Sequence, residues 1–194
     1  MPKPTAIVYI DGLNLQRRLI DKVGGVKWVD YWHLAISVIP NFEVVKVHVF
    51  TSIPNAWDPK VAQEVWAKQS DRAPNLSFHL GYVKRSTRLY PLPESSTLVT
   101  QNGLVKVIKM EEKGSDVALA SRLVMDATRG SAEIYFVATS DTDFEPALRI
   151  LRQELSVQIG LLITTDTLPK VFAKLEPNVI RHLKAKHVIE VTHN

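Results

Sequence analysis

The sequence predicts an α/β protein: a three-layer α/β/α sandwich with a central, mostly parallel sheet. Four apolar runs, rich in β-branched or aromatic residues, have the length of strands and are bounded by Asp, Gly, Ser or Thr: 6–10, 44–50, 134–138 and 157–163. Segments with helical patterning alternate with them: 12–22, 59–71, 116–128 and 143–154. Near-continuous apolar strands separated by helices are typical of a parallel sheet that is covered on both faces.

One segment departs from this alternation. Residues 82–109 are basic and aromatic, and they contain Asn102-Gly103 between two β-prone runs. Asn-Gly in such a setting is the strongest short-range signal for a hairpin. We therefore predict a basic excursion over 82–109 with an inserted hairpin near 98–108, followed by a helix that starts near Ser115.

The end of the chain is expected to complete the same domain. Residues 168–194 are predicted to form a C-terminal extension of one or two short helices and a last strand over 188–191. A chain of 194 residues is long enough to bury a substantial core in one domain. We therefore expect a single domain over 1–194, with the basic insertion and the C-terminal extension as its additions.

The composition excludes several kinds of site. The chain has no cysteine, which rules out disulfides, Cys-ligated zinc, iron–sulfur clusters and a thiol nucleophile. No apolar run approaches the roughly eighteen residues of a membrane span, and the N-terminal residues lack the apolar segment of a signal peptide. We expect a cytoplasmic protein without a membrane partner. A homodimer is compatible with its size and aromatic residues, although the sequence gives no direct sign of one.

The net charge of +4 conceals an uneven distribution along the chain. Residues 82–109 carry five basic residues and one acidic residue, whereas 110–169 carry ten acidic residues and five basic ones. An acidic centre beside a basic segment suits a protein that holds cations and a polyanion together. Solvated faces of mixed sign would give the same counts, so charge alone does not choose between these interpretations.

Acidic residues stand where the predicted strands end. Asp11 closes the first strand, and Asp141 and Asp143 follow the third one, while Asp116 begins a helix. Ligands of parallel sheets bind at the carboxyl ends of the strands, so these side chains are expected to converge. Helix capping would also place acidic residues at such positions, and it accounts for one or two of them.

Carboxylates gathered in one cleft repel one another, and a bound cation relieves this repulsion. Asp oxygens suit Mg²⁺ or Mn²⁺, which promote phosphodiester hydrolysis by polarising the phosphorus centre, lowering the pKa of a bound water and neutralising the leaving oxygen. We expect Asp11, Asp116 and Asp141 to ligate such an ion. Asp143 is expected to complete the catalytic set by assisting a ligand or activating water.

Three blocks of sequence accompany these carboxylates. They are 9–15 (Tyr-Ile-Asp-Gly-Leu-Asn-Leu), 113–120 (Lys-Gly-Ser-Asp-Val-Ala-Leu-Ala) and 139–144 (Thr-Ser-Asp-Thr-Asp-Phe). Together they resemble the signature blocks of the NYN domain, a PIN-like nuclease group, and in particular its bacterial LabA-like branch, over roughly residues 5–163. The resemblance implies a PIN-like fold and a metal-dependent endoribonuclease, a hydrolase whose acidic pocket cuts RNA. The family aspartates fall on Asp11, Asp116, Asp141 and Asp143.

Polar residues near these aspartates are candidates for binding the substrate. Asn14 matches the Asn of the first block and is expected to orient substrate or a water, and Arg17 and Arg18 follow it by one turn. Ser140 stands where the family usually has Gly. Its hydroxyl could donate to a phosphate, or its bulk could restrict how closely a phosphate approaches.

The basic excursion supplies a second set of candidates. Lys84, Arg85 and Arg88 are interleaved with Tyr82 and Tyr90. Such cations can pair with phosphates while the rings stack on bases, a combination that suits single-stranded RNA. A solvated basic loop would have the same composition.

A second function stays open: a catalytically weak regulator that keeps the fold and binds RNA or protein. Besides Ser140, a further acid common on the second-block helix is replaced near Arg122. The nearest later carboxylate, Asp126, is about 280° around the helix from Asp116, so the two do not share a face. A haloacid-dehalogenase-type phosphatase is disfavoured, because Leu13 stands where that chemistry needs a second Asp.

Overall fold

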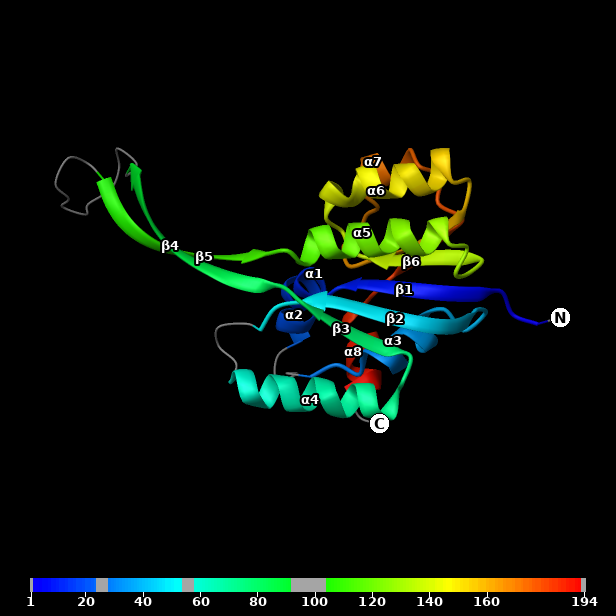
Figure 1. Ribbon diagram of the computed structural model, residues 1–194, viewed down its shortest axis with the longest axis horizontal. Coiled ribbons are helices and arrows are strands. Elements are labelled where there is room, and N and C mark those ends of the chain that lie inside the picture. Colours follow the sequence, from blue (N-terminus) through cyan, green and yellow to red (C-terminus); the bar gives the residue numbers. More distant parts are fainter. Residues whose placement is uncertain (1, 24–27, 54–57, 92–103, 193–194) are drawn as a thin grey trace.

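The computed structural model describes residues 2–23, 28–53, 58–91 and 104–192. Its central sheet has six strands in the order β3 (Leu76–Leu80), β2 (Glu43–Thr51), β1 (Thr5–Asp11), β6 (Ile134–Ala138), β7 (Gln158–Ile163) and β8 (Val179–His182). All neighbouring strands in this sheet are parallel. Helices cover both of its faces, as Figure 1 shows, which confirms the predicted three-layer sandwich.

The central strands β1, β6 and β7 are apolar along most of their length because both of their faces are buried. In β1, the side chains of Ala6, Val8 and Ile10 pack into one core, while Ile7 and Tyr9 point into the other. A strand between two cores needs apolar residues at successive positions rather than at alternate ones. This burial explains why the sequence identified β1, β2, β6 and β7.

The helices divide between the two faces. One face is covered by α1 (Gly12–Leu15), η1 (Gln16–Ile20), α2 (Asp21–Val23), α3 (Tyr31–Val38), α4 (Pro59–Arg72) and α8 (Ala185–Thr192). The other face is covered by α5 (Ser115–Thr128), η3 (Thr142–Phe144), α6 (Glu145–Arg149), η4 (Ile150–Glu154) and α7 (Lys170–Ala173). In the described part of the chain, none of the helices combines the length and apolar character that crossing a membrane requires.

The order of the strands reverses beside β1. From β1 the chain moves outward through β2 and β3, and it later returns to β6 on the other side of β1 before continuing to β7 and β8. Ile10 of β1 pairs with Ala138 of β6, so the two strands end at the same level. Asp11 and the segment that begins with Thr139 therefore emerge side by side at this reversal, where parallel sheets bind their ligands.

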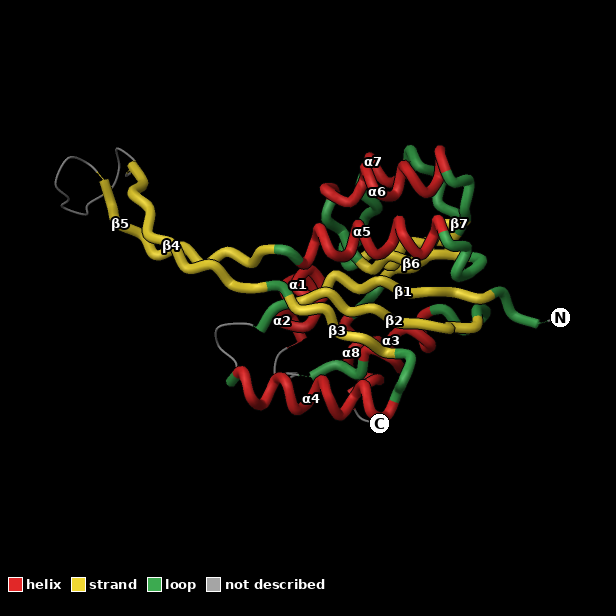
Figure 2. Tube along the Cα trace, in the orientation of Figure 1, coloured by secondary structure: helices red, strands yellow, loops and turns green. Residues whose placement is uncertain are grey.

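A second sheet projects from the body as a two-stranded antiparallel ribbon (Figure 2), which we call the arm. It consists of β4 (Tyr82–Pro91) and β5 (Leu104–Lys113), paired from Tyr82↔Lys113 to Pro91↔Leu104. The predicted hairpin near 98–108 needs correction, because the partner of β5 is 82–91 and the excursion extends to Lys113 instead of residue 109. The segment 92–103, which includes Asn102-Gly103, lies outside the described residues.

The predicted last strand over 188–191 is wrong. These residues belong to helix α8, whose Val188 is buried in the core beneath the sheet. A run of four residues with three apolar side chains does not distinguish a strand from one face of a helix. The edge of the sheet is formed instead by β8, which pairs with β7. Strands β3 and β8 and helix α3 were not among the predicted elements.

Candidate active site

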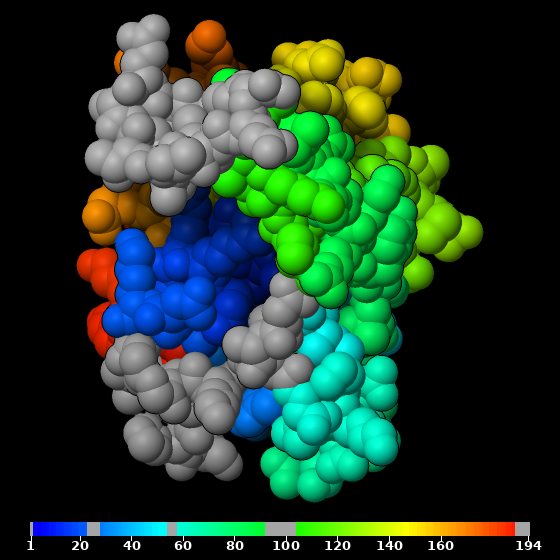
Figure 3. Space-filling view, turned by 90° about the vertical axis from the view of Figure 1, so that its left-hand side faces the viewer, coloured from blue at the N-terminus to red at the C-terminus, as the bar shows by residue number. Residues whose placement is uncertain are grey.

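A pocket with a volume of about 540 Å³ opens at the carboxyl ends of β1 and β6. Its lining comes from β1, α1, η1, the base of the arm, α5 and the segment after β6: Asp11, Leu13, Asn14, Arg17, Arg18, Met110, Glu111, Glu112, Lys113, Asp116 and Asp141. In Figure 3 the surface is hollowed between the blue N-terminal elements and the green arm. The pocket brings together Asp11, Asp116 and Asp141, the three predicted metal ligands.

Asp11 is fixed in the pocket by hydrogen bonds to both of its oxygens. It is only 6% exposed. Its Oδ1 accepts from the backbone N–H of Asn14 at 3.0 Å, which caps α1. Its Oδ2 accepts from the buried hydroxyl of Thr139 at 2.9 Å, and that hydroxyl in turn accepts from the backbone N–H of Asp141 at 3.1 Å. Thr139 therefore links the carboxylate of Asp11, at the end of β1, to the backbone of Asp141, just beyond β6.

Burial raises the pKa of Asp11 to about 6. The hydrogen bonds from Asn14 and Thr139 oppose this shift because they favour the charged form, whereas the charges of Asp116 and Asp141 add to it. A carboxyl group with a perturbed pKa in a cleft is a recognised mark of a functional site. The repulsion between these groups is the condition that a bound cation would relieve.

Asp116 reaches the pocket from the first turn of α5. Partial burial raises its pKa, and the charges of Glu112, Asp141 and Asp143 raise it further. The helix begins at Gly114, whose φ of 98° favours glycine, and Glu112 accepts a hydrogen bond from the Ser115 N–H at 3.1 Å. The carboxylate of Glu112 therefore caps α5 and lines the pocket at the same time.

Two other predicted site residues do not line the pocket. Asp143 is exposed, and its backbone N–H donates to Asp141 Oδ1 at 3.0 Å. Ser140 is buried, and its hydroxyl accepts from the Thr164 N–H at 3.0 Å and bonds the Thr164 hydroxyl at 2.9 Å. Ser140 thus joins the ends of β6 and β7, where its hydroxyl has partners within the protein.

Asn14 has a structural part in the site as well as a place in the pocket wall. Its side-chain Oδ1 accepts from the Thr164 hydroxyl at 2.9 Å and from the Ser140 N–H at 3.3 Å. It therefore ties the turn after β1 to the ends of β6 and β7. Sequence reasoning did not assign roles to Thr139 or Thr164, although Thr139 belongs to the third block that drew attention to Asp141.

Cations stand beside the carboxylates. Arg17 and Arg18 are exposed on η1, a π-helical turn, and both line the pocket as predicted. Such turns are frequent at functional sites. The predicted phosphate-binding residues Lys84, Arg85 and Arg88 lie on β4, outside the pocket wall.

The base of the arm forms a wall of the pocket that sequence reasoning missed. Met110, Glu111, Glu112 and Lys113 end β5 and line the pocket together with the aspartates. Glu111 forms ion pairs with Lys109 and, at 3.6 Å, with Lys113. The one available signal was the position of Lys113 at the start of the second block.

The carboxylates of the pocket are candidate ligands for a divalent cation. Among the residues that the structure describes, no three His, Asp or Glu side chains are arranged to hold a metal ion as they stand. The donor chemistry nevertheless fits, because Asp11, Asp116 and Asp141 supply oxygen ligands to one pocket and Asp141 raises the pKa of the other two. Binding an ion would require these side chains to draw together.

Asp126 belongs to a different network, within the body of the protein. It is 3% exposed, its Oδ2 accepts from the Tyr9 hydroxyl at 2.9 Å and from Arg122 Nε at 2.7 Å, and it anchors α5 to β1. This carboxylate does not line the pocket.

Comparisons with known proteins place the fold but not a family. No protein-family model matches the chain. Over 62 residues it is 38% identical to 6-hydroxy-3-succinoylpyridine 3-monooxygenase HspA of Pseudomonas putida, a match that covers 32% of this chain and 20% of that protein. The structure of the present chain is similar to that of a protein of unknown function from Vibrio parahaemolyticus, with a TM-score of 0.58, 13% identity and 94% of each chain covered. That similarity shows the fold alone.

Proposed function

We propose that the protein is a metal-dependent endoribonuclease of the NYN, PIN-like type that hydrolyses single-stranded RNA in the pocket. The observation that carries this proposal is the meeting of Asp11, Asp116 and Asp141, which come from three separate segments, beside Arg17 and Arg18. Carboxylates that attract a cation and cations that attract phosphate are both needed for phosphodiester hydrolysis.

The positions of the three sequence blocks support the proposed family. The first block ends β1 and starts α1, the second joins the arm to α5, and the third follows β6. The first block lies about a hundred residues before the second and the third follows the second closely, yet each contributes an aspartate to the pocket. A resemblance that is spread over the sequence is therefore gathered at a single place in the fold.

Asp11, Asp116 and Asp141 would hold Mg²⁺ or Mn²⁺. Such an ion polarises the phosphorus centre and lowers the pKa of a bound water. Thr139 fixes the orientation of Asp11 by donating to Oδ2, and the charged form of Asp11 is the form that binds a cation. Arg17 and Arg18 would pair with the phosphates that flank the scissile bond.

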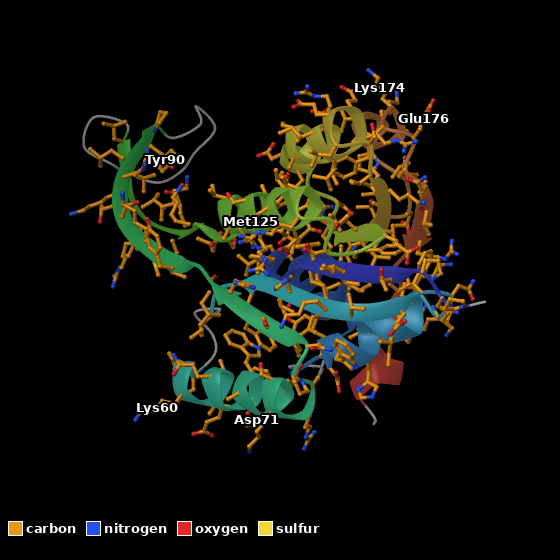
Figure 4. The ribbon with its side chains drawn as sticks, turned by 45° about the vertical axis from the view of Figure 1, so that its right-hand side comes forward. Lys60, Asp71, Tyr90, Met125, Lys174 and Glu176 are labelled. Carbon is orange, nitrogen blue, oxygen red and sulfur yellow. The ribbon has the colours of Figure 1, made fainter. Side chains whose placement is uncertain are left out.

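The direct test is cleavage of labelled single-stranded RNA with Mg²⁺ or Mn²⁺ present, beside a reaction in EDTA. We expect metal-dependent products that carry a 5′-phosphate, and we expect Asp141→Asn to abolish them. Asp71→Asn is the matched control, since Asp71 lies on α4, away from the pocket (Figure 4). RNA binding without cleavage by the wild type in every metal would contradict the proposal.

A second candidate function is a regulator that binds RNA or protein in the cytoplasm without cutting it. The observation that favours it is the lack, among the described residues, of three side chains already arranged around a metal position. The same cleavage experiment separates the two, because a regulator retains RNA binding when cleavage is absent. Monooxygenase activity is not proposed, since the match to the Pseudomonas putida enzyme covers only 20% of that protein.

A further inference from the structure

The pairing of β4 with β5 sorts the side chains of the arm onto two faces. Directly paired residues of an antiparallel ribbon share a face, and successive residues along a strand alternate between faces. The face that we call the basic face carries Tyr82, Lys84, Ser86, Arg88 and Tyr90 of β4 with Lys113, Glu111, Lys109, Val107 and Val105 of β5. The apolar face carries Val83, Arg85, Thr87, Leu89 and Pro91 with Glu112, Met110, Ile108, Lys106 and Leu104.

The basic face has an excess of positive charge. Four of its ten residues are positively charged: Lys84, Arg88, Lys109 and Lys113. Its one carboxylate is that of Glu111. Glu111 forms ion pairs with Lys109 and Lys113, and the hydrogen bond from Lys109 lowers the pKa of Glu111. Within the described part of the chain, Lys84 and Arg88 form no ion pair of their own, so their charges are available to a polyanion.

Two exposed tyrosines frame these cations. The side chains of Tyr82 and Tyr90 are 64% and 39% exposed. Eight residues of strand place them about 26 Å apart. Exposed rings among cations suit a single strand, because its unpaired bases can stack on them, whereas a duplex keeps its bases stacked inside.

The basic face is continuous with the pocket. Glu111 and Lys113 belong both to the face and to the pocket wall, to which Met110 and Glu112 of the apolar face also contribute. Tyr90 lies near the outer end of the arm, as Figure 4 shows. A strand of nucleic acid that lies along this face would therefore reach the aspartates at its inner end.

We propose that the basic face of the arm is a binding site for single-stranded RNA, extending from Tyr90 to the pocket. Cleavage of the RNA in the pocket rests on the proposed function, but binding of the RNA along the basic face does not. Arg85 and Arg88 were equivalent candidates in the sequence, but the strand pairing places them on different faces. Arg88 is part of the proposed site, whereas Arg85 lies on the apolar face.

Binding is measured by fluorescence anisotropy of labelled single-stranded RNA in EDTA, where a metal-dependent enzyme does not cut. Lys84→Ala and Arg88→Ala are each compared with a chemically matched change on the other face, Lys106→Ala and Arg85→Ala respectively. We expect each basic-face variant to reduce the slope of log K against log salt by about 0.7, the value of one phosphate contact on a single strand. The apolar-face variants are expected to leave that slope unchanged.

The tyrosines give an independent readout. Tyr82→Ala and Tyr90→Ala are each expected to weaken binding roughly 5- to 150-fold, the range of one base–aromatic stack, without changing the salt slope. Leu89→Ala, on the apolar face, is the control and is expected to keep wild-type affinity. A duplex RNA of the same sequence is expected to bind more weakly than the single strand.

Equal losses from the two faces would overturn the proposal, because they would indicate unspecific attraction to a basic arm. Unchanged affinity in the basic-face variants, or equal binding of duplex and single strand, would overturn it as well. If the face variants lose binding as expected but the wild type never cleaves, the binding site stands and the nuclease proposal fails. If the wild type cleaves and the face variants bind normally, the nuclease proposal stands and the proposed binding site on the basic face fails.

Discussion

Asp11 shows how one residue can oppose folding while it serves a site. Its folded pKa of about 6 exceeds the usual value of an Asp in an unfolded chain, about 3.9. The folded protein therefore binds a proton more readily than the unfolded chain does, and this contribution to stability is present below pH 4 and is lost as the pH rises through 6. At pH 7.5 the carboxylate of Asp11 is charged, and burying that charge opposes folding.

We expect Asp11→Asn to stabilise the protein at neutral pH, because it removes that charge. The gain should be about 1–2 kcal/mol, or roughly 3–6 °C in Tm for a protein of this size. Thermal unfolding at pH 7.5 and at pH 4.5 measures it, and the difference between the variant and the wild type should shrink at the lower pH. An equal or lower Tm of Asp11→Asn at pH 7.5 would contradict the assigned environment.

Thr139 is a positioning residue that can be tested with a conservative pair of variants. Thr139→Val keeps the shape but removes the hydroxyl that donates to Asp11 and accepts from Asp141. We expect it to destabilise the fold by about 1–3 kcal/mol and to shift the acidic limb of the pH profile of cleavage to higher pH, because the pKa of Asp11 rises. Thr139→Ser retains the hydroxyl and should restore the profile. A profile that does not move in Thr139→Val would show that the hydroxyl has no electrostatic role.

Gly12 illustrates what the sequence could not reveal at this scale. It stands at the turn from β1 into α1, and the structure requires a glycine there for a close approach between strands. A Cβ at this position would lie 2.7 Å from the Cβ of Thr51, at the end of the neighbouring strand. Close contacts of this kind depend on the pairing of β1 with β2, which no local pattern encodes.

Helix α5 connects the pocket to a buried polar network. Asp116 at its start faces the pocket, whereas Asp126 near its end accepts hydrogen bonds from Tyr9 and Arg122. His48 of β2 lies next to this carboxylate, with 3.7 Å between Nε2 and Asp126 Oδ2, and its Nδ1 shares a hydrogen bond of 2.9 Å with His79 of β3. The network joins α5 to three strands, and Tyr9, His48, His79 and Asp126 are not among the residues that line the pocket.

The network predicts a loss of stability in mild acid. Burial, followed by the charges of Arg122 and His79, lowers the pKa of His48 to about 4, and the nearby charge of Asp126 offsets part of the shift while that of Lys46 adds to it. Because the unfolded histidine titrates near 6.5, stability is fully present above that pH and falls as the pH decreases toward 4, by up to about 3 kcal/mol. Over part of this pH range the raised pKa of Asp11 has the opposite effect, because protonation of Asp11 in the folded protein increases its stability. Urea unfolding of the wild type and of His48→Gln at pH 7.5 and 5.0 isolates the His48 part, and an identical pH dependence in the two proteins would contradict it.

The elements that the sequence predicted are those with two buried faces or a strong helical pattern. Strand β6 was predicted with its observed bounds, and helix α5 to within one residue of its start, because their apolar residues leave one interpretation. Strand β3 is only partly buried and contains His79, so its conformation comes from pairing with β2. The pocket was likewise predictable only in part. The aspartates at the ends of strands could be identified from the sequence. The pocket wall that β5 forms could not, because it depends on the pairing of β5 with β4, more than twenty residues away along the chain.

At the scale of the whole molecule, the arm and the sandwich meet at two glycines. Gly81 precedes β4, and Gly114, with its φ of 98°, follows β5. Tyr82 and Lys113 are a directly paired couple, so the chain leaves the body and returns to it within about 5 Å. A Cβ on Gly81 would lie 2.8 Å from the carbonyl oxygen of Lys113, which shows how closely the two ends approach.

We expect that the arm can be removed without unfolding the sandwich. A variant in which a short Gly-Ser linker replaces 82–113 should keep the circular dichroism spectrum of the body and a single cooperative thermal transition, because both cores lie outside the arm. It should lose RNA binding in the same anisotropy assay. An aggregated or unfolded variant would show that the arm is needed for the fold itself.

One wall of the pocket belongs to the arm while the other walls belong to the sandwich, and this division has a consequence for the choice of substrate. An oligonucleotide that fills only the pocket makes no contact with Tyr90, whereas a longer one gains the contacts along the basic face. For a nuclease built in this way, kcat/KM should rise with the length of the RNA until the RNA covers the arm and should then stay level. The arm would thus act as a molecular ruler that selects long, unpaired transcripts over short fragments, including the enzyme's own products.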